Sequence, residues 1–365
     1  MNVPFFNYPK LYTSQKDKFL KVFDDVCSRG AYIMQKDLLD FEASISNFCN
    51  VKHAIGVANA TDALEIALFV SGIQEGDEVI VPSHTMTATP SAIIANRGKP
   101  VLIDCGSDGL LDPDLIEKNL SDKTKYIMPV QLNGRTCKMD KIIEVAHKNN
   151  LTIIEDSAQG LGSTYKGKQA GTFGLAGVFS FYPAKILGTL GDGGMIITDN
   201  DDFAKKIFQF RDHGRDNLDC NMWGRNSRLD NLHAAFLLFQ FQDFKEAVAR
   251  RREIANMYLN GLGDIDGLSL PFFEDDIDHF DTFQNFEVLS DRRDKLKAYL
   301  ADHGIGTIIQ WGGKAIHQFA NLGLDRFAVP VTDKYFDQCL LLPMNTLLED
   351  DEISYVIKKI KTFYG

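Results

Sequence analysis

Short apolar segments alternate with helix-forming segments through the first 200 residues, and this alternation restricts the possible folds more than any other feature. Six apolar, mostly β-branched segments predict strands: residues 77–83, 99–104, 125–131, 151–158, 176–183 and 193–200. Helical patterns separate several of them, as in residues 61–72 and 138–150. Strands and helices that alternate in this way form βαβ units. We therefore expect an α/β fold with a mostly parallel sheet and helices on both faces.

The pattern changes after about residue 235. The C-terminal part predicts a long helical stretch, a strand-like segment, a helix, a strand and a terminal helix, over residues 231–262, 281–289, 292–304, 306–311 and 350–364 respectively. This order is typical of an α+β unit. We therefore expect two domains, a large one over residues 1–240 and a smaller α+β domain over residues 241–365.

The acidic balance of the chain argues against several classes of partner. A net charge of −11 opposes general affinity for nucleic acid or for an anionic membrane surface. No apolar run approaches the roughly 20 residues that span a bilayer, and the N-terminus lacks the pattern of a signal peptide. The six cysteines show no C-x-x-C pair and no histidine cluster at zinc spacing. We therefore expect reduced thiols, no metal site and a cytoplasmic location.

A single lysine, Lys185, stands between an apolar run and a group of glycines in the stretch SFYPAKILGTLGDGG (residues 180–194). Asp156 and Ser180 end two predicted strands, and ligands of parallel sheets bind at that edge. A lysine near apolar surface loses its proton more easily, and the neutral amine attacks aldehydes. A buried Asp156 needs a cation or several hydrogen-bond donors. A plain buried ion pair or a turn-capping aspartate is the alternative interpretation of Asp156.

The stretch NATD (residues 59–62) begins a predicted helix. Free backbone N–H groups and the positive end of the dipole suit a phosphate there. Pyridoxal phosphate needs a lysine for its aldehyde, a carboxylate for its ring nitrogen and donors for its phosphate, and Lys185, Asp156, Ser180 and Thr61 supply these groups. Plain alternatives exist, because Thr61 or Asp62 could act as a helix cap only and the glycines could form an ordinary turn.

Several motifs, in this order along the chain, resemble those of the DegT/DnrJ/EryC1/StrS family of pyridoxal-phosphate-dependent sugar aminotransferases. They are GVANATDALEIAL, GDEVIVPSHTMTAT, EDSAQ, SFYPAK with GDGG, HGR, GRNSRLDNLHAA and FQNFEVL. The resemblance implies the fold of type I pyridoxal-phosphate enzymes. In that fold a mostly parallel seven-stranded sheet lies between helices, and a smaller C-terminal α+β domain follows.

The same resemblance implies roles for individual residues around the ring of the cofactor. Lys185 matches the lysine that forms the internal aldimine, and Asp156 matches the carboxylate paired with the pyridinium nitrogen. Gln159 matches the glutamine near the 3′-hydroxyl of the ring. The family commonly has an aromatic residue stacked on the ring where this chain has Met86, so either Met86 or the neighbouring His84 is expected to cover the ring.

The phosphate end of the cofactor is matched by a second group of residues. Ser180 and Thr61 match side-chain donors, and the backbone amides of Ala60 and Asp62 are expected to contribute. Asn226 matches an asparagine that the partner subunit supplies to the same phosphate. The resemblance therefore implies a homodimer with two shared active sites.

The implied reaction moves an amino group from L-glutamate to a nucleotide-linked 4-keto or 3-keto 6-deoxysugar, for amino-sugar synthesis in O-antigen, capsule or other glycans. Three alternatives stay open: a cyclitol or antibiotic-pathway aminotransferase of the family, a sugar 3-dehydratase, and a non-catalytic scaffold. The dehydratases have histidine in place of the lysine, whereas Lys185 is present here. Residues 129–135 and 310–319 depart from the family pattern, and we expect both to border the sugar or nucleotide.

Overall fold

A central sheet of seven strands organises the first 200 residues of the computed structural model, which describes residues 1–271 and 277–365. The strand order is β1-β9-β8-β5-β4-β2-β3; β9 runs antiparallel to β1 and β8, and the other neighbours are parallel. Their bounds are β1 His53–Val57, β2 Glu78–Pro82, β3 Lys99–Ile103, β4 Thr124–Ile127, β5 Thr152–Asp156, β8 Ala176–Ser180 and β9 Gly194–Thr198. The expected mostly parallel sheet is confirmed, and β1 is a strand that the sequence patterns did not predict.

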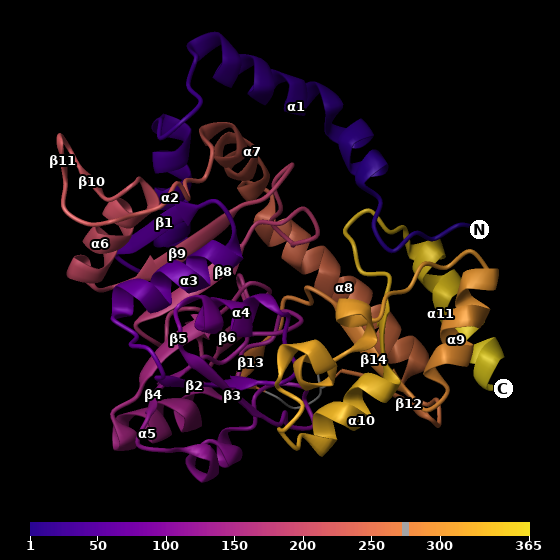
Figure 1. Cartoon of the computed structure of the whole chain (residues 1–365). Coiled ribbons are helices and arrows are strands. Elements are labelled where there is room, and N and C mark those ends of the chain that lie inside the picture. The colour runs from indigo at the N-terminus through magenta and orange to yellow at the C-terminus, as the bar shows by residue number, and fades with distance from the viewer. Residues whose placement is uncertain (272–276) are drawn as a thin grey trace.

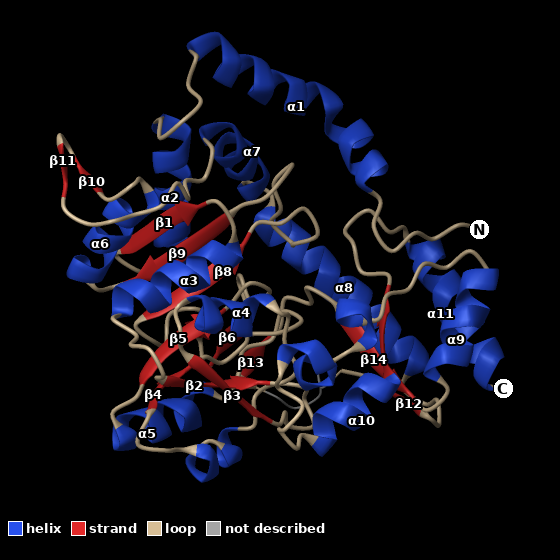
Figure 2. Ribbon diagram, viewed as in Figure 1, coloured by secondary structure: helices blue, strands red, loops and turns tan. Residues whose placement is uncertain are grey.

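Helices cover both faces of the central sheet (Figure 2). Ile196 of β9 joins the apolar cluster under the helices of residues 60–71 and 201–211, whereas its neighbours Met195 and Ile197 join the cluster under the helices of residues 36–49 and 231–241. This division follows from the alternation of side chains along a strand. The helices are α2 Lys36–Cys49, α3 Ala60–Ser71, α4 Ala88–Ala95, α5 Met139–Asn149, α6 Asp201–Arg211 and α7 Asn231–Phe241. In the described part of the chain, no helix has both the length and the apolar character needed to cross a membrane.

A second sheet lies in the C-terminal part of the chain, drawn from orange to yellow in Figure 1. Its three antiparallel strands are β12 Leu268–Ser269, β14 Phe286–Ser290 and β15 Cys339–Leu342. The surrounding helices are α8 Phe244–Leu262, α9 Arg293–Asp302, α10 Pro330–Gln338 and α11 Asp350–Tyr364. Residues of this part form their own apolar cluster, which Val3 joins from the N-terminus. We propose on this ground that residues 241–365 are the smaller domain.

Short elements complete the fold. A small sheet combines β13 His279–Phe280, β6 Thr164–Tyr165 and β7 Lys168–Gln169, and a projecting hairpin combines β10 Arg215–Asp216 and β11 Asp219–Cys220 (Figure 1). Five 3₁₀ turns are described: η1 Pro113–Leu115, η2 Glu117–Asn119, η3 Gln310–Gly313, η4 Ile316–Gln318 and η5 Ala320–Leu322.

Two predicted elements of the C-terminal part differ in extent from the structure. The expected helix over 231–262 is interrupted at Gln242 and Asp243, so that α7 packs on the central sheet and α8 enters the second core. The expected strand over 306–311 pairs through a single bridge, between Ile308 and Leu341. The extended segment ends at Trp311 and Gly312, which have left-handed backbone angles, with φ of 48° and 73°.

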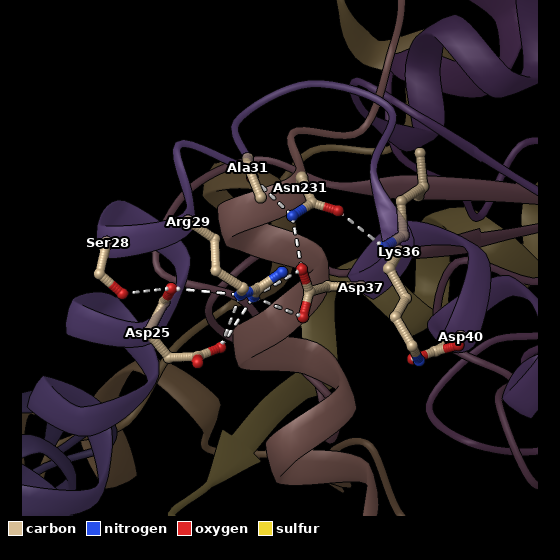
Figure 3. A network of polar contacts seen from close by, with 9 residues as sticks. Asp25, Ser28, Arg29, Ala31, Lys36, Asp37, Asp40 and Asn231 are labelled. Carbon is tan, nitrogen blue, oxygen red and sulfur yellow. Dashed lines mark hydrogen bonds and ion pairs between the residues drawn. The ribbon is translucent and has the colours of Figure 1, made fainter.

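The long helix α1 (Tyr8–Arg29) is tied to the large part of the molecule by a polar network at its C-terminal end (Figure 3). Arg29 donates hydrogen bonds to Asp25 and to Asp37, which lies on α2. Asn231, the first residue of α7, donates to Asp37 Oδ2 and to the Ala31 carbonyl, both at 2.6 Å. The network therefore joins α1, α2 and α7 at one point.

Candidate active site

A cavity of about 530 Å³ opens where the carboxyl ends of the central strands face the C-terminal part of the chain. Its walls come from the start of α3, the ends of β5 and β8, and the loop after β8. Seven residues that the sequence predicts for a site line this cavity: Ala60, Thr61, Met86, Asp156, Gln159, Ser180 and Lys185. The opposite wall comes from the C-terminal part, through Gln284, Asn285, Ile308, Gln310, Trp311 and Leu341.

Asp156 ends β5 with its carboxylate almost completely buried, at 5% exposure. Oδ2 accepts a hydrogen bond from the Thr89 hydroxyl at 2.7 Å, and Oδ1 accepts one from the Ala158 N–H at 3.1 Å. Burial raises the pKa of Asp156, and these two donors and the charge of Lys185 oppose that rise. A cation placed against this carboxylate would lower its pKa again, so the site suits a protonated ring nitrogen.

Lys185 lies in the loop between β8 and β9, where its own N–H donates to the Tyr182 carbonyl at 2.9 Å. Burial lowers the pKa of Lys185 to about 8, against the attraction of Asp156. The loop is held from the opposite wall by Gln284, which accepts from the Ile186 N–H at 2.9 Å and donates to the Ala184 carbonyl at 2.8 Å. Lys185 is therefore a positioned amine with a substantial neutral fraction near pH 8.

The start of α3 forms the polar end of the cavity. Asn59 caps the helix, because its Oδ1 accepts from the Asp62 N–H at 2.8 Å. Asp62 Oδ2 accepts from the Ser227 hydroxyl at 2.7 Å. The contribution of the Asp62 amide to a phosphate stays a prediction, and such a contact would compete with the bond to Asn59. Ala60 and Thr61 line the cavity together with Ser180. These groups suit an anion at the N-terminus of a twelve-residue helix.

Met86 lines the cavity, whereas His84 does not. Met86 is 50% exposed. His84 is buried at 1% exposure, and its ring packs against Trp311, Tyr335 and Phe336. Its Nδ1 donates to the Gly109 carbonyl at 2.8 Å. His84 is therefore held away from the cavity, and we propose that Met86 covers the ring.

Several residues at or behind the cavity wall were not predicted from the sequence patterns. Thr89 of α4 comes four residues after Thr85, and the two hydroxyls lie 2.7 Å apart. Gln284, Asn285 and Gln310 lie about 100 residues or more after Lys185 in the chain, and only tertiary packing brings them to the cavity. In the segment that departs from the family pattern, Gln131 is fully buried and bonds to Glu155 at 2.7 Å, so its contacts are structural.

Comparisons with known proteins agree with this constellation. The sequence model of the DegT/DnrJ/EryC1/StrS aminotransferase family matches residues 13–361. The chain belongs to this family. A pleiotropic regulatory protein of Geobacillus stearothermophilus is 35% identical, over 100% of this chain and 99% of its own length. The dTDP-3-amino-3,4,6-trideoxy-α-D-glucose transaminase of Streptomyces venezuelae is 34% identical, over 98% and 95%. The crystal structure of S. venezuelae DesV with a ketimine intermediate superposes with a TM-score of 0.95 at 34% identity, covering 100% of this chain and 98% of DesV.

As a DegT/DnrJ/EryC1/StrS enzyme, the chain is an aminotransferase that uses pyridoxal 5′-phosphate. The described residues fit that cofactor. Lys185 would offer the amine, Asp156 the carboxylate for the ring nitrogen, and Ser180 with the start of α3 the donors for the phosphate. The 530 Å³ of the cavity leave room for a substrate beside the ring.

One residue matched to the family lies elsewhere. Asn226 is exposed on the loop before α7, forms an isolated bridge with Asp212, and is not among the described residues that line the cavity. Arg228 and Arg215 of the same region pair with Asp212, at 2.8 Å and 3.9 Å. A role for Asn226 at a phosphate would therefore require the active site of a second subunit.

Proposed function

We propose that this aminotransferase moves an amino group from L-glutamate to the ketone of a nucleotide-linked 3-keto or 4-keto 6-deoxysugar. The observation that carries the proposal is the convergence of Lys185, Asp156, Ser180 and the start of α3 on one cavity. The full-length similarity to a transaminase of a dTDP-linked sugar supports this substrate class. The amino sugar formed would serve the synthesis of O-antigen, capsule or another glycan.

The residues of the chain divide the work in the following way. Pyridoxal phosphate, when bound, supplies the electron sink that makes amino-group transfer possible. Asp156, held by Thr89, keeps a positive charge at the ring nitrogen. Lys185 Nζ, when free, takes up and returns the proton of the reacting carbon, because its pKa of about 8 lets it act as both base and acid near neutral pH. Ser180 and Thr61 anchor the phosphate.

We also propose that two copies of the chain form the enzyme and share their active sites. Leu218 and Trp223 are almost completely exposed on and next to the β10–β11 hairpin, and Met86, Tyr182 and Leu190 are half exposed at or near the cavity. Apolar surface of this kind is typical of an interface. In such a pair Asn226 of one subunit contacts the phosphate of the pyridoxal phosphate that is bound in the active site of the other subunit. We place the enzyme in the cytoplasm, consistent with six unpaired cysteines.

The test is amino transfer by the purified holoenzyme with L-glutamate and a panel of nucleotide-linked 3-keto and 4-keto sugars. We expect a bound yellow cofactor that glutamate bleaches, and formation of one amino sugar. Lys185→Ala should abolish both the yellow absorbance and turnover. A bleached cofactor with no amino-sugar product from any keto sugar, but with product from a keto-cyclitol, would contradict the substrate class. A protein that binds no cofactor would contradict the whole proposal.

A further inference from the structure

A buried carboxylate on the C-terminal sheet organises a polar network behind the cavity. Glu287 of β14 is 4% exposed. Its oxygens accept hydrogen bonds from Asn133 Nδ2 at 2.7 Å, from Gln310 Nε2 at 3.0 Å and from the Tyr335 hydroxyl at 3.1 Å. Because a carboxylate of this kind accepts hydrogen bonds, it fixes which end of each neighbouring amide is the NH₂ group.

Because Glu287 fixes the orientation of the Asn133 amide, it also fixes the amide of Asn285, which bonds to Asn133. Asn133 turns its NH₂ toward Glu287, so its Oδ1 faces the other way and accepts from Asn285 Nδ2 at 2.8 Å. The same Nδ2 group donates its second hydrogen to Gln159 Oε1 at 3.3 Å. Both hydrogens of the Asn285 amide are therefore used, and its orientation is determined.

Gln159 receives a second, independent constraint. The backbone N–H of Asn133 donates to Gln159 Oε1 at 2.9 Å, and a backbone N–H is always a donor. With Oε1 occupied by two donors, the Nε2 group of Gln159 is the end left for the cavity that this residue lines. The chain thus presents a hydrogen-bond donor, and not an acceptor, at this point of the wall.

We propose that Asn285 is a positioning residue for the cofactor, which holds the Gln159 amide so that its NH₂ group donates to the 3′-oxygen of the ring. The inference rests on the pyridoxal phosphate site described above. A donor there stabilises negative charge on the ring oxygen. That charge is greatest when the nitrogen of the Lys185–cofactor linkage has lost its proton. The donor therefore lowers the pKa of the linkage nitrogen, and its loss raises that pKa.

The experiment is a pH titration of the visible absorbance of the holoenzyme in four forms: wild type, Asn285→Asp, Gln159→Ala and the double variant. Asn285→Asp has the same shape but replaces the donor by a charged acceptor. A hydrogen bond from the Gln159 NH₂ group to this carboxylate is stronger than the bond that the neutral Asn133 N–H makes to Oε1, so Gln159 turns its NH₂ toward residue 285. The negative charge that Asn285→Asp adds also raises, by itself, the pKa of the nitrogen that links Lys185 to the cofactor. The same substitution in the Gln159→Ala background measures this effect of charge separately. We expect Asn285→Asp to raise the pKa by about one pH unit more in the wild-type background than in the Gln159→Ala background.

Two further variants complete the design. Asn285→Ala removes one of the two donors to Gln159 Oε1 without adding charge. Because the Asn133 N–H still holds the amide, the pKa should rise by less than in Asn285→Asp in the wild-type background, and not at all with Gln159→Ala. This variant decides the question if Asn285→Asp does not fold. Asn149→Asp adds the same charge on α5 and should leave the titration unchanged. Equal shifts in both backgrounds would overturn the role of Asn285, while a chain with no visible absorbance would overturn the cofactor site itself.

Discussion

The Thr89 hydroxyl donates a hydrogen bond to Asp156 Oδ2 over 2.7 Å. Because Thr89 has one hydroxyl hydrogen, Thr85 must be the donor in the 2.7 Å contact between Thr85 and Thr89. Thr85, in the bend before α4, and Thr89, in the first turn of α4, thus form a relay of two donors that ends on the carboxylate. The two threonine hydroxyls hold Asp156 Oδ2 in place. The buried carboxylate can therefore face a cationic ring nitrogen.

Thr89→Val tests this relationship, because valine keeps the shape and removes the hydrogen bond. We expect the affinity for pyridoxal phosphate to fall roughly tenfold, as the loss of a hydrogen bond to a charged group implies. The measurement is cofactor binding to the apo-enzyme, followed by absorbance. Thr87→Val is the matched control, since Thr87 makes no capping bond and does not line the cavity. Equal affinities in the two variants would contradict the role of Thr89.

The lowered pKa of Lys185 predicts how cofactor uptake depends on pH. Below the pKa of about 8 most of the amine is protonated, so the rate of covalent attachment should rise about tenfold per pH unit. Above it the amine is neutral and the rate should level off. Stopped-flow absorbance of apo-enzyme mixed with pyridoxal phosphate gives this profile, with Nα-acetyl-lysine as control. An enzyme rate that keeps rising to the ordinary lysine pKa of 10.5 would exclude the shift.

Gln284 predicts a second positioning effect, because its amide bonds on both sides of Lys185, to Ile186 N–H and to the Ala184 carbonyl. Gln284→Leu removes both bonds. We expect kcat to fall roughly tenfold and backbone hydrogen exchange at residues 184–188 to accelerate. Gln240→Leu removes one bond to the Gly188 carbonyl and should change kcat less. Unchanged exchange in Gln284→Leu would show that the clamp does not hold the loop.

The shared-site proposal predicts rescue between two inactive variants. Lys185→Ala lacks the amine, and Asn226→Asp places a carboxylate against the phosphate of the partner. A mixed dimer contains one site with an intact lysine and an intact asparagine from the partner. Refolding the two variants together should therefore restore roughly a quarter of wild-type activity. If Asn226 acts within its own chain, no mixture of these variants recovers activity.

Most of the central sheet and the groups of the cofactor site were predictable from the sequence. Five of the six predicted strands are parallel strands, which carry apolar runs because they are buried on both faces, and the antiparallel β9 is buried throughout as well. Asp156 and Ser180 mark the ends of two of the parallel strands. The five-residue strand β1 (His53–Val57) was not predicted, because a strong helical pattern begins only a few residues after it. The predicted strand over residues 306–311 pairs only at Ile308, and Trp311 at its end has a left-handed φ of 48° and packs against His84 and Phe336. Such tertiary contacts are not visible in the local pattern.

The wall of the cavity opposite Lys185 was not predictable from local patterns. Asn133 and Glu287 lie 154 positions apart, and each reads alone as an ordinary polar residue of a loop or a strand. The two residues come into contact only in the folded chain, where β14 places the Glu287 carboxylate behind the loop that follows β4. The choice between Met86 and His84 was equally a matter of packing, because His84 turns into an aromatic cluster away from the cavity.

The central claim is that Lys185 Nζ carries the cofactor, and one measurement tests it directly. The holoenzyme is reduced with borohydride, digested, and its peptides are analysed by mass spectrometry. The account predicts that the pyridoxyl group is found on Lys185, within the peptide that contains residues 180–194. A pyridoxyl group on another lysine, or none on a chain that binds the cofactor, would contradict the account.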